Sequence, residues 1–403
     1  MQNSHHQIAI IVVVIFTLLQ LIVLLLFNYT PYPDSDGYIF LAEECIANND
    51  WYPISTKLND YPFLWNIGTV NAIILSLKLF HSIIPLLVVY CIMKGITAGL
   101  LYQVTQTICN EKTAFITLLL YVIYPANYGE GTSTLSELPF MFFIMLGIYL
   151  SLVRNWSITG GMMLAIANWF RPMGIIFLLA LLLCLLFKWR KSIKLLIGYI
   201  GMIVIIGTTT MYRTGLFLYQ AKTGWMALMD YSSNHSPESM MVRERADWNV
   251  CQKDSAWQSL FIDWVKDHPK EYIAQMPSKL VKTYVSDNVN MCTFIPDKQD
   301  ADYMYDKISM GTLINCFPRL SAVQWLTILN LFVYFALLVT SVVSLFYFRR
   351  NTHLLPVSVI VLGTLLLLFV GHGETRFHIP FMPFFMILST LYLNKNYGKD
   401  KMD

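Results

Sequence analysis

Two acidic residues that follow the first long apolar run of the chain are the first candidates for chemistry. Asp34 and Asp36 stand two residues apart in the segment 32–38, directly after the uncharged run 8–27. Charge at a membrane surface is costly unless it is used, and either carboxylate could take a proton from an acceptor hydroxyl as a general base. Helix capping is an equal alternative, because Asp36 precedes an amphipathic stretch and aspartate is a favoured N-cap.

A second group of titratable side chains lies between the last two apolar runs. His372, Glu374, Arg376 and His378 fall within seven residues. The planar guanidinium of Arg376 suits a phosphate and keeps its charge when it is partly buried. His378 could assist it, and Glu374 could hold it in place. The alternative is an Arg–Glu pair that extends to the membrane interface without binding a ligand.

Arg171 and Glu137 interrupt apolar sequence where the chain is expected to reach the same side of the membrane. Arg171 is followed by proline, and a charged residue inside a membrane segment indicates a functional site by default. A purely structural pairing of Arg171 with Glu130 or Glu137 is the alternative. For Glu137, which begins an apolar run, the alternative is a favourable acid in the first turn of a helix.

Several common catalytic motifs do not occur in the sequence. The chain contains no glycine-rich phosphate loop, Gly-x-Ser-x-Gly elbow or His-Glu-x-x-His motif, which argues against a nucleotide-driven pump and against the common membrane hydrolases. Its cysteines and histidines have no zinc-type spacing. A divalent metal would suit the spacing of Asp34 and Asp36, but no further ligand cluster requires one.

The composition determines the kind of fold that must position these residues. Of the 403 residues, 56% are hydrophobic and only 13% are charged, whereas a soluble domain has roughly 25% charged residues. A soluble enzyme and a nucleic-acid binder are therefore excluded, and we expect an all-α polytopic membrane protein. A membrane helix needs about 20 apolar residues, and apolar runs of that length or somewhat shorter lie at 8–27, 63–80, 84–108, 113–124, 138–153, 158–170, 172–187, 195–211, 320–346, 354–370 and 378–393.

The basic residues predict the orientation of the chain. Clusters of Lys and Arg at 188–194, 349–350 and 395–401 should be cytoplasmic. An odd number of crossings must then separate the first outer loop from the inner connection at 110–112, so the run 63–80 is expected to be interfacial or re-entrant. The polar segments that contain the candidate residues lie together on the outer face: 28–62, 125–137, 212–318 and 371–377.

Three regions are expected along the chain. Residues 1–211 form an N-terminal transmembrane region with the first outer loop at 28–62, and residues 319–403 form a C-terminal transmembrane region. The segment 212–318 between them is too long and too rich in Trp and Tyr for a connector. Helical spacing of its apolar residues around Pro269 and Pro277 predicts a small helical subdomain on the outer surface. A solvated loop domain that only covers the membrane part is the alternative.

The order of these motifs resembles that of the GT-C glycosyltransferases, most closely the glycosyltransferase 39-like branch of protein O-mannosyltransferases and aminoarabinose transferases. The acidic first loop with Tyr38 after it has their layout, but Asp36 is followed by Gly37 rather than an acid, so the catalytic position of the family is open between Asp34 and Asp36. The other matching stretches are Pro125 through Glu137, Arg171-Pro172, Asp267 through Ile273, and Glu374 through Pro383, with Phe377 where the family has Tyr.

The resemblance implies a GT-C-like bundle of about 10–11 transmembrane helices with outer-face loops. It also implies a sugar donor linked to polyprenyl phosphate, inverting transfer with Asp36 or Asp34 as the base, and generally no metal. Arg376, with Arg171 and His378, would stabilise the departing phosphate, while Glu374, Glu137 and Tyr38 would support the site. The acceptor would be a protein, a lipid or a glycan. The resemblance to bacterial members favours the bacterial cytoplasmic membrane. Membrane lipids are further expected partners, and nucleic acid is not.

Two other functions use the same charges. A lipid-linked sugar flippase or transporter would pass a phosphate head group, and it predicts polar residues along the spans or an inverted repeat. Neither pattern is clear in this sequence. An outer-face polysaccharide polymerase or ligase would differ only in the donor that it uses.

Overall fold

The computed structural model describes residues 2–53, 66–294, 321–371 and 373–394. Helices and their connections make up all of these ranges, and no strand occurs within them. Within these described ranges, five helical segments are long and apolar enough to cross a membrane. They comprise α1 (Gln2–Phe27), α4 (Ile84–Ile108), α9 (Trp189–Thr214), α16 (Ala322–Tyr347) and α17 (Leu355–Val370) with the turn before it. The predicted class, an all-α multi-pass membrane protein, is confirmed.

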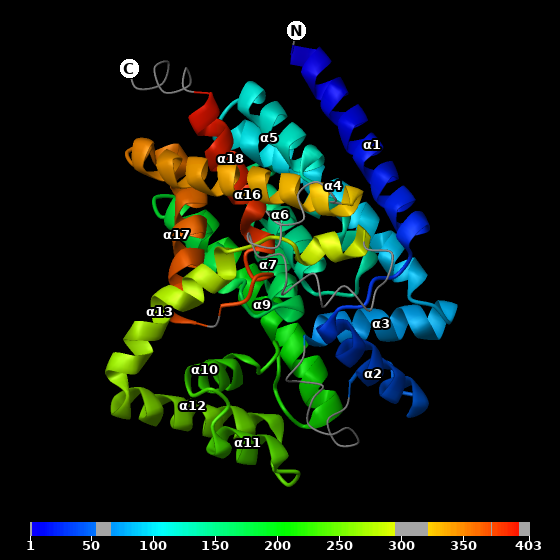
Figure 1. Ribbon diagram of the computed structural model, residues 1–403, viewed down its shortest axis with the longest axis vertical. Helices are drawn as coiled ribbons and strands as arrows, with labels where there is room; N and C mark the ends of the chain where they lie inside the picture. The colour runs from blue at the N-terminus through cyan, green and yellow to red at the C-terminus, as the bar shows by residue number, and fades with distance from the viewer. Residues whose placement is uncertain (1, 54–65, 295–320, 372, 395–403) are drawn as a thin grey trace.

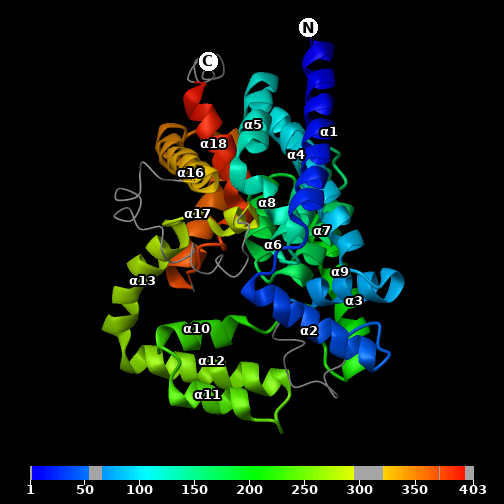
Figure 2. The same ribbon diagram turned by 45° about the vertical axis from the view of Figure 1, so that its right-hand side comes forward.

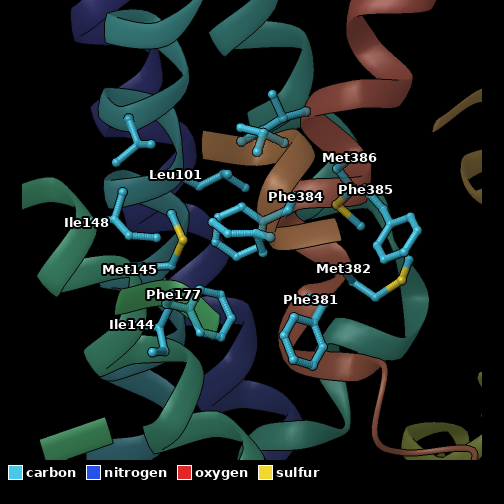
Figure 3. Packing of buried hydrophobic residues seen from close by; sticks show 14 of the residues in the cluster. Leu101, Ile144, Met145, Ile148, Phe177, Phe381, Met382, Phe384, Phe385 and Met386 are labelled. Atoms are coloured by element: carbon cyan, nitrogen blue, oxygen red, sulfur yellow. The ribbon is translucent and has the colours of Figure 1, made fainter. Parts of the chain in front are cut away.

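Shorter apolar helices fill the interior between the long ones. They are α5 (Glu111–Ile123), α6 (Glu137–Leu152), α7 (Ser157–Phe170), α8 (Ile175–Cys184) and α18 (Met382–Leu393). Phe177 of α8 stacks on Phe381 just before α18, with ring centroids 5.3 Å apart, and Phe140 of α6 packs edge-on against Phe177. Figure 3 shows this contact among the other buried aromatic, aliphatic and methionine side chains. The total number of crossings stays a prediction.

Two helices near the N-terminus pack together, α2 (Pro33–Ala47) and α3 (Ile67–Phe80). α3 runs across, rather than along, α1 in both views, and α2 does so in the view of Figure 2 (Figure 1, Figure 2). α3 exposes Leu79 and Phe80, as suits a helix at the membrane interface. The interfacial or re-entrant placement of the run 63–80, whose first residues lie outside the described ranges, stays a prediction.

A bend precedes α6. Two short 3-10 turns, Pro125–Tyr128 and Glu130–Thr132, form a segment that meets α6 at 110°, as in a broken span or a re-entrant loop. α6 has 16 residues, so its two ends are separated by roughly 24 Å. Lys191 of the basic cluster hydrogen-bonds to Asn155 just beyond the far end of α6. The basic cluster and Glu137 therefore lie at opposite ends of the bundle.

A layer of polar helices covers the end of the bundle that is remote from both chain termini (Figure 1). It comprises α10 (Gly224–Ser232), α11 (Pro237–Glu244), α12 (Val250–Asp267) and α13 (Pro269–Tyr284). Trp257 of α12 is fully buried and donates a hydrogen bond of 3.0 Å to the Ser239 hydroxyl of α11. Pro269 is the first residue of α13 and Pro277 lies within that helix. Buried side chains of this layer thus pack together and against Ile67 of the first region, and whether the layer is a separate subdomain stays a prediction.

We predict that the contact between α7 and α9 depends on two glycines. A Cβ atom at Gly161 would overlap the Leu195 carbonyl, and one at Gly198 would overlap the Ile158 carbonyl. Gly161→Ala and Gly198→Ala should each destabilise the protein by about 1–3 kcal/mol, measured by thermal unfolding in detergent. Gly201→Ala, also on α9 but with open space around it, is the matched control. Equal stability of all three variants would contradict this account.

Candidate functional site

Arg376 lies at the centre of a cluster of charged side chains. Its guanidinium is 2.5 Å from an Asp34 carboxylate oxygen, 3.0 Å from Glu374 and 3.8 Å from Glu137. Only 16% of the Arg376 side chain is exposed. Burial by itself lowers the pKa of the guanidinium, but Glu137, Asp34 and Glu374 more than offset this effect and raise the pKa well above its ordinary value. Arg376 is therefore a permanent cation.

The start of α2 determines which aspartate reaches Arg376. Pro33 is the first residue of the helix and Tyr32 is the N-cap, without a side-chain cap bond. Both acids therefore lie inside the first turn, and the interpretation of Asp36 as an N-cap was wrong. Two residues along a helix correspond to a rotation of about 200° around its axis, so such side chains point to nearly opposite sides. Asp34 accordingly faces Arg376, whereas Asp36 is exposed.

Arg171 and Glu137 form an ion pair that lies next to Arg376. Arg171 follows the end of α7, where it donates hydrogen bonds of 2.7 Å to Glu137 and 3.2 Å to the Ser136 hydroxyl. The same Oε1 atom of Glu137 faces both arginines. The guanidinium of Arg171 also lies 4.6 Å from the centre of the Phe377 ring. Of the two structural partners considered for Arg171, the structure selects Glu137.

Tyr38 holds α2, the helix that carries Asp34, next to the cluster. The side-chain amide of Asn66 donates to the Tyr38 hydroxyl at 2.7 Å and to Ser136 at 3.0 Å. Asn66 thereby joins α2 to the segment that leads into α6. Tyr38 is almost fully buried, so its role in this geometry is to fix α2 rather than to meet a ligand directly.

His378 belongs to a different, fully buried network. Its Nδ1 lies 2.9 Å from the Thr283 carbonyl and its Nε2 lies 3.1 Å from Asp287. A carbonyl only accepts hydrogen bonds, so Nδ1 is the donor in the contact with Thr283. Tyr124 donates to the other oxygen of Asp287. Both ring nitrogens are thus engaged, and the structure does not bring His378 to Arg376.

A second ion pair lies inside the bundle. Lys94 of α4 is fully buried, where it contacts Glu130 and donates a hydrogen bond of 3.0 Å to Asn127. Glu130 therefore pairs with Lys94 and not with Arg171. This pair attaches the bent segment before α6 to α4.

Sequence reasoning missed several of these residues. Lys94 is the only charge in the apolar run 84–108, and a lone intramembrane lysine is a recognised signal that could have found it. Asp287 and Ser136 had no comparable signal, because their partners come from distant parts of the chain. Tyr231 of α10, whose hydroxyl is 3.4 Å from Glu374, was likewise missed. Burial and Glu374 raise its pKa to about 12.

The cluster combines two cations with several carboxylates. Within the described part of the chain, no group of three or more His, Cys, Asp or Glu side chains could hold a metal ion. The two arginines could bind an anion such as a phosphate. Asp34, at the edge of the cluster and partly exposed, could exchange a proton with a bound molecule.

Comparisons with known proteins provide little further information. No protein-family model and no curated protein matches the chain. Among solved structures, the chain is similar to ArnT from Cupriavidus metallidurans bound to undecaprenyl phosphate, with 13% identity and a TM-score of 0.38. The match covers 96% of this chain and 79% of that one.

We predict that the buried pair Lys94–Glu130 stabilises the bent segment as a unit. Lys94→Met or Glu130→Leu alone leaves a buried charge without its partner, which should cost about 3–5 kcal/mol, whereas the double variant should recover most of this loss. Thermal unfolding in detergent would measure the three variants. Lys266→Met, which breaks an exposed pair with Asp263, is the control and should change stability little. A double variant as unstable as the sum of the single ones would contradict the prediction.

Proposed function

We propose that this protein is a membrane glycosyltransferase that moves a sugar from a polyprenyl-phosphate donor to an acceptor hydroxyl. The observation that supports it most is the Arg376 cluster, in which a permanent cation and a partly exposed carboxylate meet at one end of an apolar bundle. A lipid-linked donor can keep its tail among the helices while its phosphate reaches that end. The order of motifs that resembles the GT-C enzymes supports the same reaction.

The geometry suggests how donor binding and base catalysis are coupled. In this arrangement Asp34 is an ion-pair partner of Arg376. A donor phosphate that binds Arg376 competes with Asp34 and releases this carboxylate for the acceptor. Asp34 then takes the proton of the acceptor hydroxyl, whose oxygen attacks the anomeric carbon. The bond between that carbon and the phosphate oxygen breaks, and the phosphate leaves with the electron pair.

The departing phosphate is stabilised by the two arginines. Arg376 would contact it directly, and Arg171, held by Glu137, adds positive charge behind it. Fixed cations at the site of developing charge are usually the largest contribution to such catalysis. His378, which sequence reasoning placed at the phosphate, acts instead by holding the loop, since both of its nitrogens are bonded.

We further propose the outer face of a bacterial cytoplasmic membrane as the location of the site. The basic cluster at 188–194 lies at the opposite end of α6 from Glu137, and basic residues favour the cytoplasm. The acceptor would then be an envelope component. A flippase and a polysaccharide polymerase or ligase are the competing functions. The measurements below test the flippase, and activity solely with a lipid-linked oligosaccharide would indicate the polymerase or ligase.

Arg376 is expected to contact the donor phosphate directly. Arg376→Ala should weaken binding of a polyprenyl-phosphate donor by about 10- to 100-fold, because a charge-assisted contact to the phosphate is lost. Binding is measured by donor titration of purified protein in detergent. Arg245→Ala removes an exposed arginine that pairs with Asp247 and is the control. Unchanged donor affinity and turnover in a folded Arg376→Ala protein would refute the phosphate site.

The second prediction separates the two aspartates. Asp34→Asn should lower sugar transfer by about 10²- to 10⁴-fold, the usual contribution of a general base, without weakening donor binding. Asp36→Asn, two residues away on the exposed side of α2, should leave transfer nearly unchanged. Transfer from radiolabelled polyprenyl-phosphate sugars to membrane acceptors measures both. Transfer lost only in Asp36→Asn would reverse the assignment, and donor binding without turnover by the wild type would favour a flippase.

A further inference from the structure

The helix α13 has three distinct faces. One face is buried against the protein through Tyr272, Lys279 and Thr283. A polar face includes Gln275 and Lys282. The third face is apolar and exposed, and its residues recur every four positions along one side of the helix: Ile273, Pro277, Val281 and Val285.

The exposure of this third face is large. Ile273 and Val281 are each 63% exposed and Val285 is 52% exposed. On a helix, positions four apart lie on one side, so these side chains form a continuous stripe rather than scattered single residues. A stripe of this kind on a polar helical layer requires an apolar partner.

Contacts at both ends of α13 place the helix at the level of the membrane interface. The Tyr272 hydroxyl donates a hydrogen bond of 2.7 Å to the carbonyl of Val370, the last residue of the spanning helix α17. At the other end, the Tyr284 ring lies 5.9 Å from Phe385 in the first turns of α18. α13 therefore lies where one apolar helix ends and the next begins, and both views show it at the edge of the molecule beside α17 (Figure 1, Figure 2).

We propose that the apolar stripe of α13 is embedded in the lipid bilayer, as an interfacial helix at the end of the bundle that contains Arg376. The spanning helix α17, whose last residue contacts α13 through Tyr272, itself exposes apolar residues up to Val370. Lys270 is exposed at the start of α13, where its side chain can extend to lipid phosphates. This inference does not depend on the proposed reaction.

Insertion of α13 would also position the loop that holds Arg376. The Lys279 carbonyl lies so close to Gly373 that a Cβ atom there would overlap it. The Thr283 carbonyl accepts the hydrogen bond from His378. The last loop is thus packed directly on the face of α13 opposite the lipid.

The test is site-specific photocrosslinking of the full chain in nanodiscs made from phosphatidylcholine and phosphatidylglycerol. A benzophenone amino acid replaces Ile273 or Val281 on the stripe. The matched control is the same replacement of Lys282 on the polar face of the same helix, whose Nζ lies 5.7 Å from the centre of the Tyr231 ring. After irradiation, mass spectrometry identifies what each probe has captured. Size-exclusion chromatography first confirms that each variant remains folded.

We expect at least about fivefold more lipid adduct at positions 273 and 281 than at 282, as for an interfacial amphipathic helix. Lipid yields no higher than at 282 would overturn the proposal. So would crosslinks from 273 and 281 to another part of the chain or to a second copy, because protein would then cover the stripe. Loss of sugar transfer by the variants would leave this result unaffected, since adduct formation does not require activity.

Discussion

A charged side chain inside an apolar bundle must find its counter-charge there, because water is absent and an unpaired buried charge is costly. Arg376 shows how this constraint organises the protein. Three carboxylates surround it, from the start of α2, from the start of α6 and from its own loop. None of these segments is adjacent to another in the sequence. The guanidinium therefore acts as the point at which the connections at this end of the bundle meet.

Two further buried networks extend the same principle. Lys94 holds the bent segment before α6 through Glu130. His378 holds the end of α13, in the layer of polar helices, through Asp287 and the Thr283 carbonyl. Tyr124 links the His378 network back to the bent segment through Asp287. Each network leaves the helices free to pack through apolar side chains while it fixes the polar connections between them. The site residues can thus be held rigidly although most of them lie outside long helices.

The layer of polar helices, α10 to α13, contributes to the site as well as covering this end of the bundle. Tyr231 of α10 contacts Glu374, and α13 supports the loop that contains Arg376. If α13 also lies in the bilayer surface, the lipid, the loop and the cation are mechanically connected. An enzyme whose donor is itself a membrane lipid would benefit from a catalytic loop held at the depth of the lipid phosphate.

The sequence by itself determined the class of protein and the segments in which the charges would gather. Both follow from local properties, since the length and hydrophobicity of a run decide whether it can enter a membrane, and a charge beside such a run is conspicuous. The presence of Asp34, Glu137, Arg171 and Arg376 at the site could be predicted in this way. Only the tertiary structure decided their pairing. α2 begins at Pro33, and this start turns Asp34 and not Asp36 toward Arg376. His378 instead contacts Asp287. The sequence could not show these pairings, because partners that only folding brings together leave no mark in the local pattern of either segment.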